Sequence, residues 1–219
     1  MGVYIALHAH SAYSFAVGAV SPREMVRGSK NLGLSGLALL DYDGVYGLME
    51  ARAAAREAEL PFLPGCEFTL EDESHLPVIC RSSQGYSALT GAISAHHLAA
   101  GRREADRQNL SELASWAKGQ WLVLTGTRAG PLRRVLYRFE IAAAARFLEQ
   151  LKELFGAENV AVEAALAGFD GEERLAAQLD HLARKTKLPL VATSAARCAN
   201  PASQRLADVM IATRLARPL

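Results

Sequence analysis

Cysteine is scarce in this sequence of 219 residues, and its three copies, Cys66, Cys80 and Cys198, lie far apart. No two of them form a Cys-x-x-Cys pair, which argues against a disulfide framework and against a zinc ribbon. A run of about 18 apolar residues is also missing, and no basic segment followed by an apolar stretch opens the chain. We therefore expect a cytoplasmic protein with no membrane partner.

An excess of either charge is lacking as well, because 24 Lys and Arg residues against 23 Asp and Glu residues give a net charge of +1. Contact with DNA would therefore have to come from a local patch or from a partner domain. Glycine-rich phosphate loops are absent too, since neither a Gly-x-Gly-x-x-Gly nor a Walker-type motif follows the first apolar segment. This absence removes the usual nucleotide-binding role of an open parallel sheet.

Apolar segments of strand length alternate with amphipathic helical segments along the whole chain, half of which is hydrophobic. The segments predicted as strands are 4–8, 36–40, 61–67, 75–80, 121–125, 160–166 and 188–193. Such alternation predicts an α/β fold with a parallel sheet in one domain, residues 1–219. Polar residues end several of these segments, and a barrel gathers its site from the carboxyl ends of many strands. A barrel is therefore favoured over an open sheet.

Two helix starts are marked clearly in the sequence. Ser21-Pro22-Arg23-Glu24 forms a capping box with proline at the first helical position, and Asn200-Pro201 opens the last helix. In that last helix the spacing predicts a buried side with Leu206, Val209, Met210 and Thr213. The same helix is expected to expose Arg205, Asp208, Ile211, Arg214 and Leu215. Its apolar residues beyond one stripe could contact a partner surface, or Ile211 and Leu215 could extend the face that packs on the barrel.

The first apolar segment ends in His8-Ala9-His10. Alternate strand residues share a face, so both imidazoles point the same way and could supply half of a metal coordination shell. The alternative is a pair of surface or hydrogen-bonded histidines at the close of a strand. The Arg-rich stretch from Gly101 to Asn109, with Arg102, Arg103 and Arg107, could contact phosphate or form a solvated loop.

Several motifs together resemble the PHP (polymerase and histidinol phosphatase) family. They are Leu7-His8-Ala9-His10-Ser11-Ala12-Tyr13-Ser14, Leu39-Leu40-Asp41-Tyr42-Asp43-Gly44-Val45-Tyr46-Gly47-Leu48, Pro64-Gly65-Cys66-Glu67, His75-Leu76-Pro77-Val78-Ile79-Cys80 and Leu190-Val191-Ala192-Thr193. The chain is most similar to the N-terminal PHP domain of bacterial C-family DNA polymerases, the polymerase III α subunits. Ser14 to Ala19 followed by Pro22-Arg23-Glu24 resembles the error-prone branch of these polymerases.

The resemblance implies a distorted (β/α)7 TIM-like barrel, which in active members carries a trinuclear metal centre for phosphoester hydrolysis. By the same resemblance, His8, His10, Glu67 and His75 stand where family metal ligands stand, and Asp41 lies beside them to support a ligand. Other ligand positions are replaced, at Val17, Tyr42, Thr127, Ala195 and Arg197.

A trinuclear centre is therefore not expected in this chain. Arg197 would place a fixed positive charge where a divalent ion sits in the family, and repulsion at about 4 Å costs ~8 kcal/mol even at an effective dielectric constant of about 20. The replaced positions leave room for at most a single divalent ion, Zn²⁺, Mn²⁺ or Mg²⁺, or for none.

Three hypotheses follow from the resemblance and the replaced ligands. In the first, a metal-depleted barrel supports a polymerase core in cis or in trans during replication or repair synthesis and meets DNA only through that core. In the second, the chain is an active metal-dependent phosphoesterase or 3′–5′ exonuclease with a reduced site. In the third, the four ligand-type residues form a hydrogen-bonded polar cluster, with Arg197 as an ion partner of Glu67.

Overall fold

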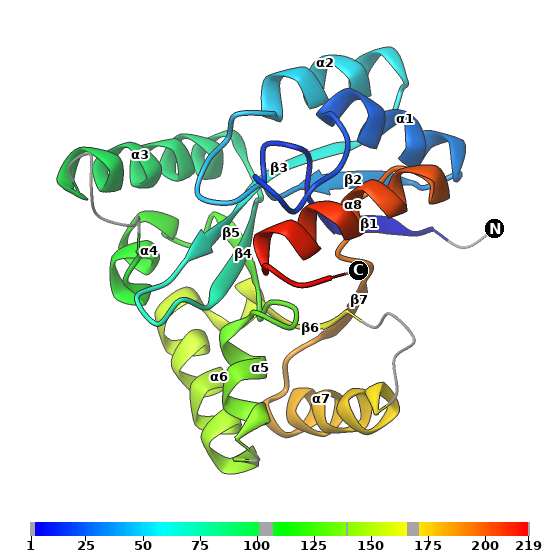
Figure 1. The fold of residues 1–219 in the computed structure, drawn as a ribbon. Helices are drawn as coiled ribbons and strands as arrows, with labels where there is room; N and C mark the ends of the chain where they lie inside the picture. Colours follow the sequence, from blue (N-terminus) through cyan, green and yellow to red (C-terminus); the bar gives the residue numbers. More distant parts are fainter. Residues whose placement is uncertain (1–2, 101–106, 139, 166–170, 219) are drawn as a thin grey trace. The chain divides into compact units, whose positions relative to one another are not determined.

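The structure is a computed structural model that describes residues 3–100, 107–138, 140–165 and 171–218. Its strands are β1 (Ile5–Ala9), β2 (Gly36–Leu39), β3 (Phe62–Thr69), β4 (His75–Cys80), β5 (Trp121–Leu124), β6 (Val160–Ala165) and β7 (Leu190–Thr193). Its helices are α1 (Pro22–Asn31), α2 (Leu48–Glu57), α3 (Ser83–Ala100), α4 (Leu110–Ala117), α5 (Pro131–Tyr137), α6 (Ile141–Phe155), α7 (Glu172–Thr186) and α8 (Pro201–Arg214), with a 3-10 turn η2 (Ala157–Asn159) (Figure 1).

Within the described residues, seven strands follow one another in the sheet in chain order, from β1 to β7. The pairs β1–β2, β2–β3, β5–β6 and β6–β7 are parallel. Beyond β7, Ala196 forms a parallel bridge with Ala9 of β1, so the order continues back to the first strand. These pairings confirm the predicted α/β class with a barrel-like sheet.

One strand departs from the predicted parallel sheet. β4 runs antiparallel to β5, with Val78 opposite Val123 and Cys80 opposite Trp121. The cause is the short connection from Thr69 to His75, which has the length of a hairpin loop and cannot hold a crossover helix. The reversal places the beginning of β4, rather than its end, at the edge where β5 ends.

The chain divides into two compact units, Met1–Cys66 with Ser194–Leu219, and Glu67–Thr193. The division falls inside β3, between two residues joined by a peptide bond. In the first unit, α1 packs against both α2 and β2 (Figure 1). In the second unit, α6 packs against α4, α5 and α7, and its buried face carries Ala144, Leu148, Leu151 and Phe155.

The first helix begins as predicted. The Ser21 side chain accepts a hydrogen bond from the backbone N–H of Glu24, and the Glu24 carboxylate accepts one from the Ser21 N–H at 2.8 Å. The Ser21 hydroxyl also donates to this carboxylate at 2.8 Å, and the hydrogen bonds from the Ser21 N–H and hydroxyl lower the pKa of the Glu24 carboxyl below its usual value. The spacing of Met25, Val26, Ser29 and Leu32 predicts one buried face, but Leu32 is 72% exposed because it caps the helix beyond its last turn.

The last helix also begins as predicted, with Asn200 as its cap, but its predicted buried side is wrong. Leu206 is 51% exposed and Val209 40% exposed, and the buried residue of α8 is Ala207. Ile211, expected to be exposed, is half-buried. Apolar residues occur all around this helix, so spacing alone did not identify the face that packs on the protein.

Of the Arg-rich stretch, Arg102 and Arg103 lie outside the described residues. Arg107 is described, and it donates a hydrogen bond to the exposed carboxylate of Glu73 at 2.6 Å. None of the helices in the described part of the chain has the length and apolar character that crossing a membrane requires.

Candidate metal site and a second polar cluster

The two histidines of the first motif lie together and are buried. β1 ends at Ala9, so His8 lies within the strand and His10 directly after it, and their side chains share a face as the spacing of two predicts. Their Nε2 atoms are 3.1 Å apart. A hydrogen bond between them requires one ring to donate and the other to accept.

Ser14 determines which nitrogen of His10 carries the proton. The Ser14 hydroxyl lies 2.6 Å from Oδ1 of Asp41 and 2.9 Å from Nδ1 of His10. A carboxylate only accepts, so the hydroxyl donates its single proton to Asp41 and accepts from the Nδ1–H of His10. In the neutral ring Nε2 of His10 then keeps its lone pair, and Nε2–H of His8 is the donor. This is the arrangement that a metal-binding imidazole needs.

Asp41 supports this arrangement from the end of β2. Its Oδ1 also accepts from the Ser11 backbone N–H at 2.7 Å, and its Oδ2 accepts from the Ser11 hydroxyl at 2.6 Å. With three such bonds the buried carboxylate holds the loop after β1 rather than facing an ion. We name His8, His10, Ser14 and Asp41 the histidine cluster.

Glu67 completes a group of three metal-ligand types with His8 and His10, and all three side chains are buried. One ligand atom from each lies within 4.8 Å of the others. Two imidazole nitrogens and one carboxylate oxygen fit one divalent ion such as Zn²⁺ or Mn²⁺, although they do not select between metals. Bound there, such an ion would supply a Lewis acid toward a phosphoryl oxygen or a water molecule.

The fourth predicted ligand, His75, is not part of that group of described residues. It opens the reversed strand β4, where its Nδ1 lies 3.4 Å from the Thr69 hydroxyl. Its ligand role stays a prediction.

The replaced ligand positions have different surroundings. Val17 is buried, the Tyr42 ring lies 4.7 Å from that of His10, Thr127 is half-buried, and Ala195 has a φ of 45°. Of these four side chains, Val17 and Ala195 carry no ligand atom, and the other two offer only a hydroxyl.

Arg197 lies on the segment that pairs with β1. His10 donates its backbone N–H to the Ala196 carbonyl at 2.8 Å, and Ala19 donates to the Arg197 carbonyl at 2.9 Å. The Arg197 side chain is half-buried, and its Nε is buried without a hydrogen-bond partner among the described residues. Its predicted ion pair with Glu67 stays a prediction.

A second buried polar cluster, which the sequence analysis did not identify, lies in the second unit. Glu163 of β6 is fully buried, and its Oε1 accepts a hydrogen bond from the Thr193 hydroxyl at 2.5 Å. The Thr125 hydroxyl accepts from the Glu163 backbone N–H at 2.9 Å. Arg133 of α5 is 3% exposed and donates to the carbonyl of Ala165 at 3.0 Å.

Burial lowers the pKa of Arg133, and the negative charges of Tyr137, Glu163 and Glu172 oppose this shift. The charge of Glu163 thus favours the charged form of Arg133. We name Arg133, Glu163, Thr125 and Thr193 the arginine cluster. The one signal for it in the sequence was a carboxylate inside the apolar run Val160–Ala165.

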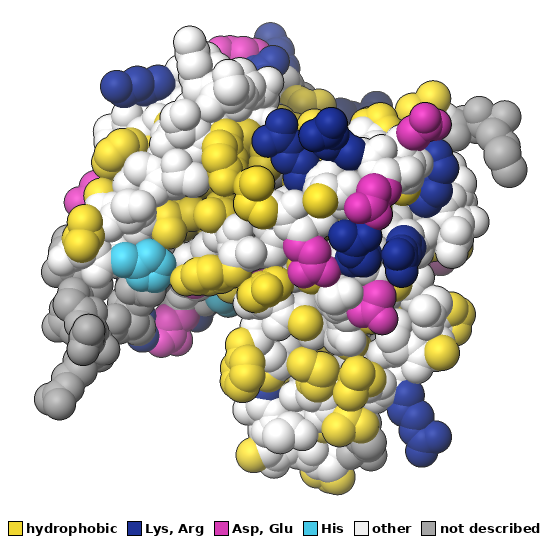
Figure 2. Space-filling model, turned by 90° about the horizontal axis from the view of Figure 1, so that it is seen from above, with side chains coloured by type: hydrophobic (Ala, Val, Ile, Leu, Met, Phe, Trp, Pro, Cys, Tyr) yellow, Lys and Arg dark blue, Asp and Glu magenta, His cyan; other side chains and the backbone are white. Residues whose placement is uncertain are grey.

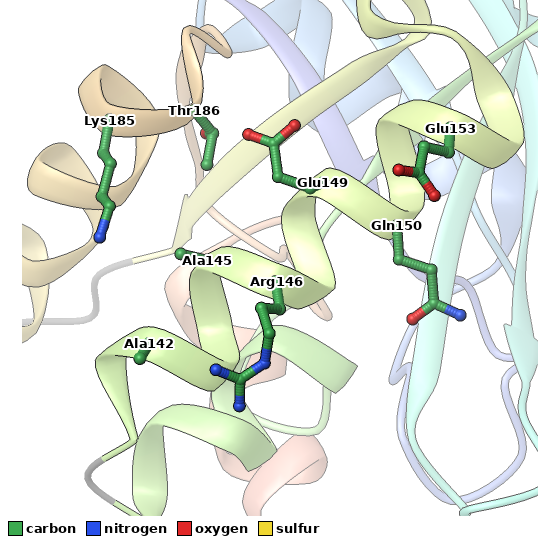
Figure 3. A pocket seen from close by; sticks show the side chains of 8 residues that line it. All are labelled: Ala142, Ala145, Arg146, Glu149, Gln150, Glu153, Lys185 and Thr186. Atoms are coloured by element: carbon green, nitrogen blue, oxygen red, sulfur yellow. The ribbon is translucent and has the colours of Figure 1, made fainter.

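A shallow pocket of about 490 Å³ lies between α6 and α7 (Figure 3). Side chains of both charge signs line it, among them Arg146, Glu149 and Lys185, and none of the predicted site residues does. Lys152 bridges the two helices nearby, donating to the Glu149 carboxylate at 2.7 Å and to the Thr186 carbonyl at 3.0 Å. The pocket is thus a surface hollow apart from both clusters.

Comparison with known proteins agrees with the motifs. Over residues 6–165 the chain matches the model of the PHP domain family. It is 37% identical to the error-prone DNA polymerase of Mycobacterium tuberculosis (strain ATCC 25618 / H37Rv) over 226 residues, which cover 99% of this chain and 21% of that protein. The error-prone DNA polymerase of Cutibacterium acnes is also 37% identical, over 99% of this chain and 20% of its own length. The chain thus spans about a fifth of these relatives.

Solved structures share the fold at low sequence identity. An amidohydrolase from Chromobacterium violaceum, with bound sulfate and no metal, superposes with a TM-score of 0.62 at 18% identity and covers 90% of this chain and 88% of its own. A protein from Bifidobacterium adolescentis assigned as a metal-dependent phosphoesterase gives a TM-score of 0.60 at 17% identity, with coverage of 96% and 97%. The family match, extending over most of the chain, establishes that this protein belongs to the PHP domain family.

Proposed function

We propose that this chain acts as a supporting PHP domain of an error-prone type of DNA polymerase, in the cytoplasm, and that its main task is to bind the polymerase core rather than to hydrolyse phosphoesters. The observation that carries this proposal is the similarity over 99% of the chain to about a fifth of longer polymerases. In these relatives about four fifths of the polypeptide lies outside the matched segment. That remaining polypeptide is what the matched segment would contact.

The exposed apolar face of α8 supports a partner-binding role. Leu206 and Val209 are three residues apart, share a face of the helix and are 51% and 40% exposed. Apolar side chains grouped in this way on a surface mark an interaction site more often than single ones do. Figure 2 shows one face of the protein, on which hydrophobic side chains lie among interspersed basic and acidic ones.

The test is association of the chain with the part of an error-prone DNA polymerase that follows the matched segment. Leu206→Asp should weaken association at least ten-fold, because it places a charge in the apolar contact, while the melting temperature stays within a few degrees of the original. The matched control is Leu32→Asp, which puts the same charge on a side chain that is 72% exposed on α1. Equal affinities of both variants and the original chain would contradict the proposal.

A second function, metal-dependent phosphoester hydrolysis, is favoured by the grouping of His8, His10 and Glu67. We rank it second because Val17, Ala195 and Arg197 supply no ligands where active family members are expected to have them. Purified chain incubated with Mn²⁺ and a single-stranded or mismatched 3′ end should release no mononucleotides. Release that disappears in Glu67→Gln would instead establish the hydrolase.

A further inference from the structure

The side of α8 that faces solvent carries a stripe of small and apolar side chains. It consists of four exposed residues spaced by four, three and four positions: Ala202, Leu206, Val209 and Thr213. This is the spacing of alternating d and a positions in a heptad, so the four side chains lie along one side of the helix. The buried residue Ala207 precedes Val209 by two positions, slightly more than half a turn, and therefore lies on the opposite side.

The stripe offers apolar contact area along its length. Leu206 is 51% exposed and Val209 is 40% exposed. Thr213 contributes its methyl group, because its hydroxyl donates a hydrogen bond to the Val209 carbonyl at 2.8 Å and is thus satisfied within the helix. Apolar a and d positions that face solvent are typical of a helix that packs against a second helix.

One charged residue borders this stripe. Arg205 directly precedes Leu206 and so occupies the g position, where charged residues pair with a partner helix. Its side chain is exposed and forms no ion pair with another described residue. Asp208 lies three residues further along, at a spacing that permits an ion pair, but its carboxylate accepts a hydrogen bond from the Gln204 side chain at 2.8 Å instead.

Arg205 also does little for the helix itself. Cations stabilise a helix from its last turn, where Arg214 lies, whereas Arg205 is nearer the N-terminal end, to which the macrodipole gives a partial positive charge. An exposed guanidinium with neither an ion partner nor a favourable position in its helix is available to a carboxylate from outside. The stripe and Arg205 thus describe a partner with an apolar side and an acidic residue next to it.

A second copy of this chain does not supply that acidic residue. In a parallel pair of two copies of α8, the g position faces the e positions of the other copy, which are Ser203 and Met210. In an antiparallel pair the g positions face one another, and these are Arg205 and Ala212. Neither arrangement places a carboxylate opposite Arg205, so the charge favours a different polypeptide.

We propose that α8 pairs along this stripe with an amphipathic helix of the polymerase core, and that this helix carries an aspartate or glutamate opposite Arg205. The proposal rests on the proposed function and deepens it, because it names the chemistry of the surface that α8 binds. About four fifths of each polymerase relative lies outside the matched segment and is long enough to contain such a helix. Apolar contact then provides most of the affinity, and the ion pair at the g position selects this helix over others.

The test measures association of the chain with the polymerase part used in the test above, at about 50 and about 500 mM salt. Arg205→Glu should lower the affinity about five-fold or more at the lower salt concentration and less at the higher one, where the ion pair is screened. Arg205→Lys keeps the charge and should retain most of the affinity. Val209→Ala should lower the affinity to a similar extent at both salt concentrations, because it removes apolar contact only.

Arg214→Glu is the matched control. Arg214 is exposed on the same helix, but it lies seven residues from Ala207 and therefore on the side of α8 away from the stripe. Its replacement should leave the affinity unchanged and lower the melting temperature slightly, because the last turn loses a favourable cation. Arg205→Glu should show the reverse, a loss of affinity with no loss of melting temperature, which a structural role of Arg205 would not produce.

Three results would overturn this inference alone. The first is an equal loss of affinity for Arg205→Glu and Arg214→Glu, because a general charge effect rather than one ion pair would then act. The second is a loss for Leu206→Asp without any loss for Arg205→Glu, which would leave the proposed function intact and make the contact purely apolar. The third is self-association of the chain that Leu206→Asp abolishes, since the stripe would then bind a second copy. Absence of any association between the original chain and the polymerase part would overturn both proposals.

Discussion

The histidine cluster and the arginine cluster are both buried polar groups, but the carboxylate of each is stabilised in a different way. In the first unit, the carboxylate of Asp41 is held by hydroxyl and N–H donors, and the imidazoles of His8 and His10 lie beside it with their Nε2 atoms 3.1 Å apart. In the second unit, the carboxylate of Glu163 has Arg133 as a counter-charge within the protein. The first carboxylate is thus held by neutral donors, and the second lies in the field of a cation.

This difference shows two ways in which a barrel can stabilise a buried carboxylate. A buried carboxylate requires a positive partner, which either a metal ion or a guanidinium can supply. Where the guanidinium belongs to the chain, the charge balance no longer depends on metal supply. The arginine cluster should therefore matter for stability, and the histidine cluster for what the protein binds.

The largest effect is expected from Arg133→Met, which leaves the carboxylate of Glu163 buried without its cation. Breaking such a pair costs about 3–5 kcal/mol, which chemical denaturation with fluorescence detection measures directly. The double variant Arg133→Met with Glu163→Gln should recover much of that loss, because the buried charge is gone. Glu163→Gln alone leaves Arg133 without its counter-charge and should also destabilise.

Arg134→Met is the matched control for this prediction. Arg134 is the next residue of α5 but is exposed, and its nearest carboxylate oxygen, on Asp72, lies 3.8 Å away. An exposed pair of this kind contributes at most about 1 kcal/mol. Similar losses of unfolding free energy for Arg133→Met and Arg134→Met would show that the buried Arg133 stabilises the protein no more than an exposed arginine does.

The second effect concerns metal binding by the histidine cluster. We expect at most one divalent ion per chain, and Ser14→Ala should weaken its binding roughly 10–100-fold, because the Nδ1–H of His10 loses the acceptor that orients the ring. Isothermal titration calorimetry with Zn²⁺ and Mn²⁺ measures both stoichiometry and affinity, and His8→Ala should remove binding. Ser115→Ala, which changes a serine bonded only within α4, is the control.

Three ions per chain would contradict the single site. Unchanged affinity in Ser14→Ala would show that His10 is oriented by something other than the Asp41 network.

The histidine cluster could be predicted from sequence because its signal is local. His8 and His10 are two residues apart at the end of an apolar segment, and Asp41 ends the next segment, so alternation along strands brings them to one edge. The capping box at Ser21 and the cap at Asn200 were predicted correctly for the same reason, since every group in them lies within four residues. The role of Ser14 was missed, because nothing in the spacing indicates which serine of a loop will face a histidine.

The arginine cluster could not be predicted, because its members come from separate elements. Glu163 and Arg133 are 30 residues apart, and α5 itself was not predicted, since a helix of seven residues has too few turns to show a period. The face of α8 and the direction of β4 were wrong for a related reason. Both depend on what packs beside the element, which in a barrel is determined by residues far away in the sequence.

The smallest predicted effect concerns the Cys80 thiol, a buried titratable group that has no counter-charge, unlike the two clusters. Burial raises the pKa of the Cys80 thiol to about 12, from its usual value of 9.0, and no neighbouring cation opposes the shift. The folded protein therefore disfavours the thiolate that the unfolded chain forms above pH 9. The contribution of this thiol to stability is complete below pH 9 and declines as the pH rises toward 12.

Unfolding free energies measured by urea denaturation at pH 8, 9 and 10 test this sign, with Cys80→Val as the variant, because valine fills a similar volume in β4 and cannot ionise. We expect the original chain to lose more stability than Cys80→Val over this range. Cys198→Val is the control, since Cys198 is half-buried and its own pKa is raised by burial and by Asp208. Cys198→Val should change the pH dependence of the unfolding free energy less than Cys80→Val does. The Cys198 thiol is less buried, so ionising it in the folded protein requires less free energy. Parallel curves for Cys80→Val and the original chain would mean that β4 opens enough at high pH for the thiolate to be solvated, and the interior of the second unit would then be less closed than the buried Arg133 and Glu163 indicate.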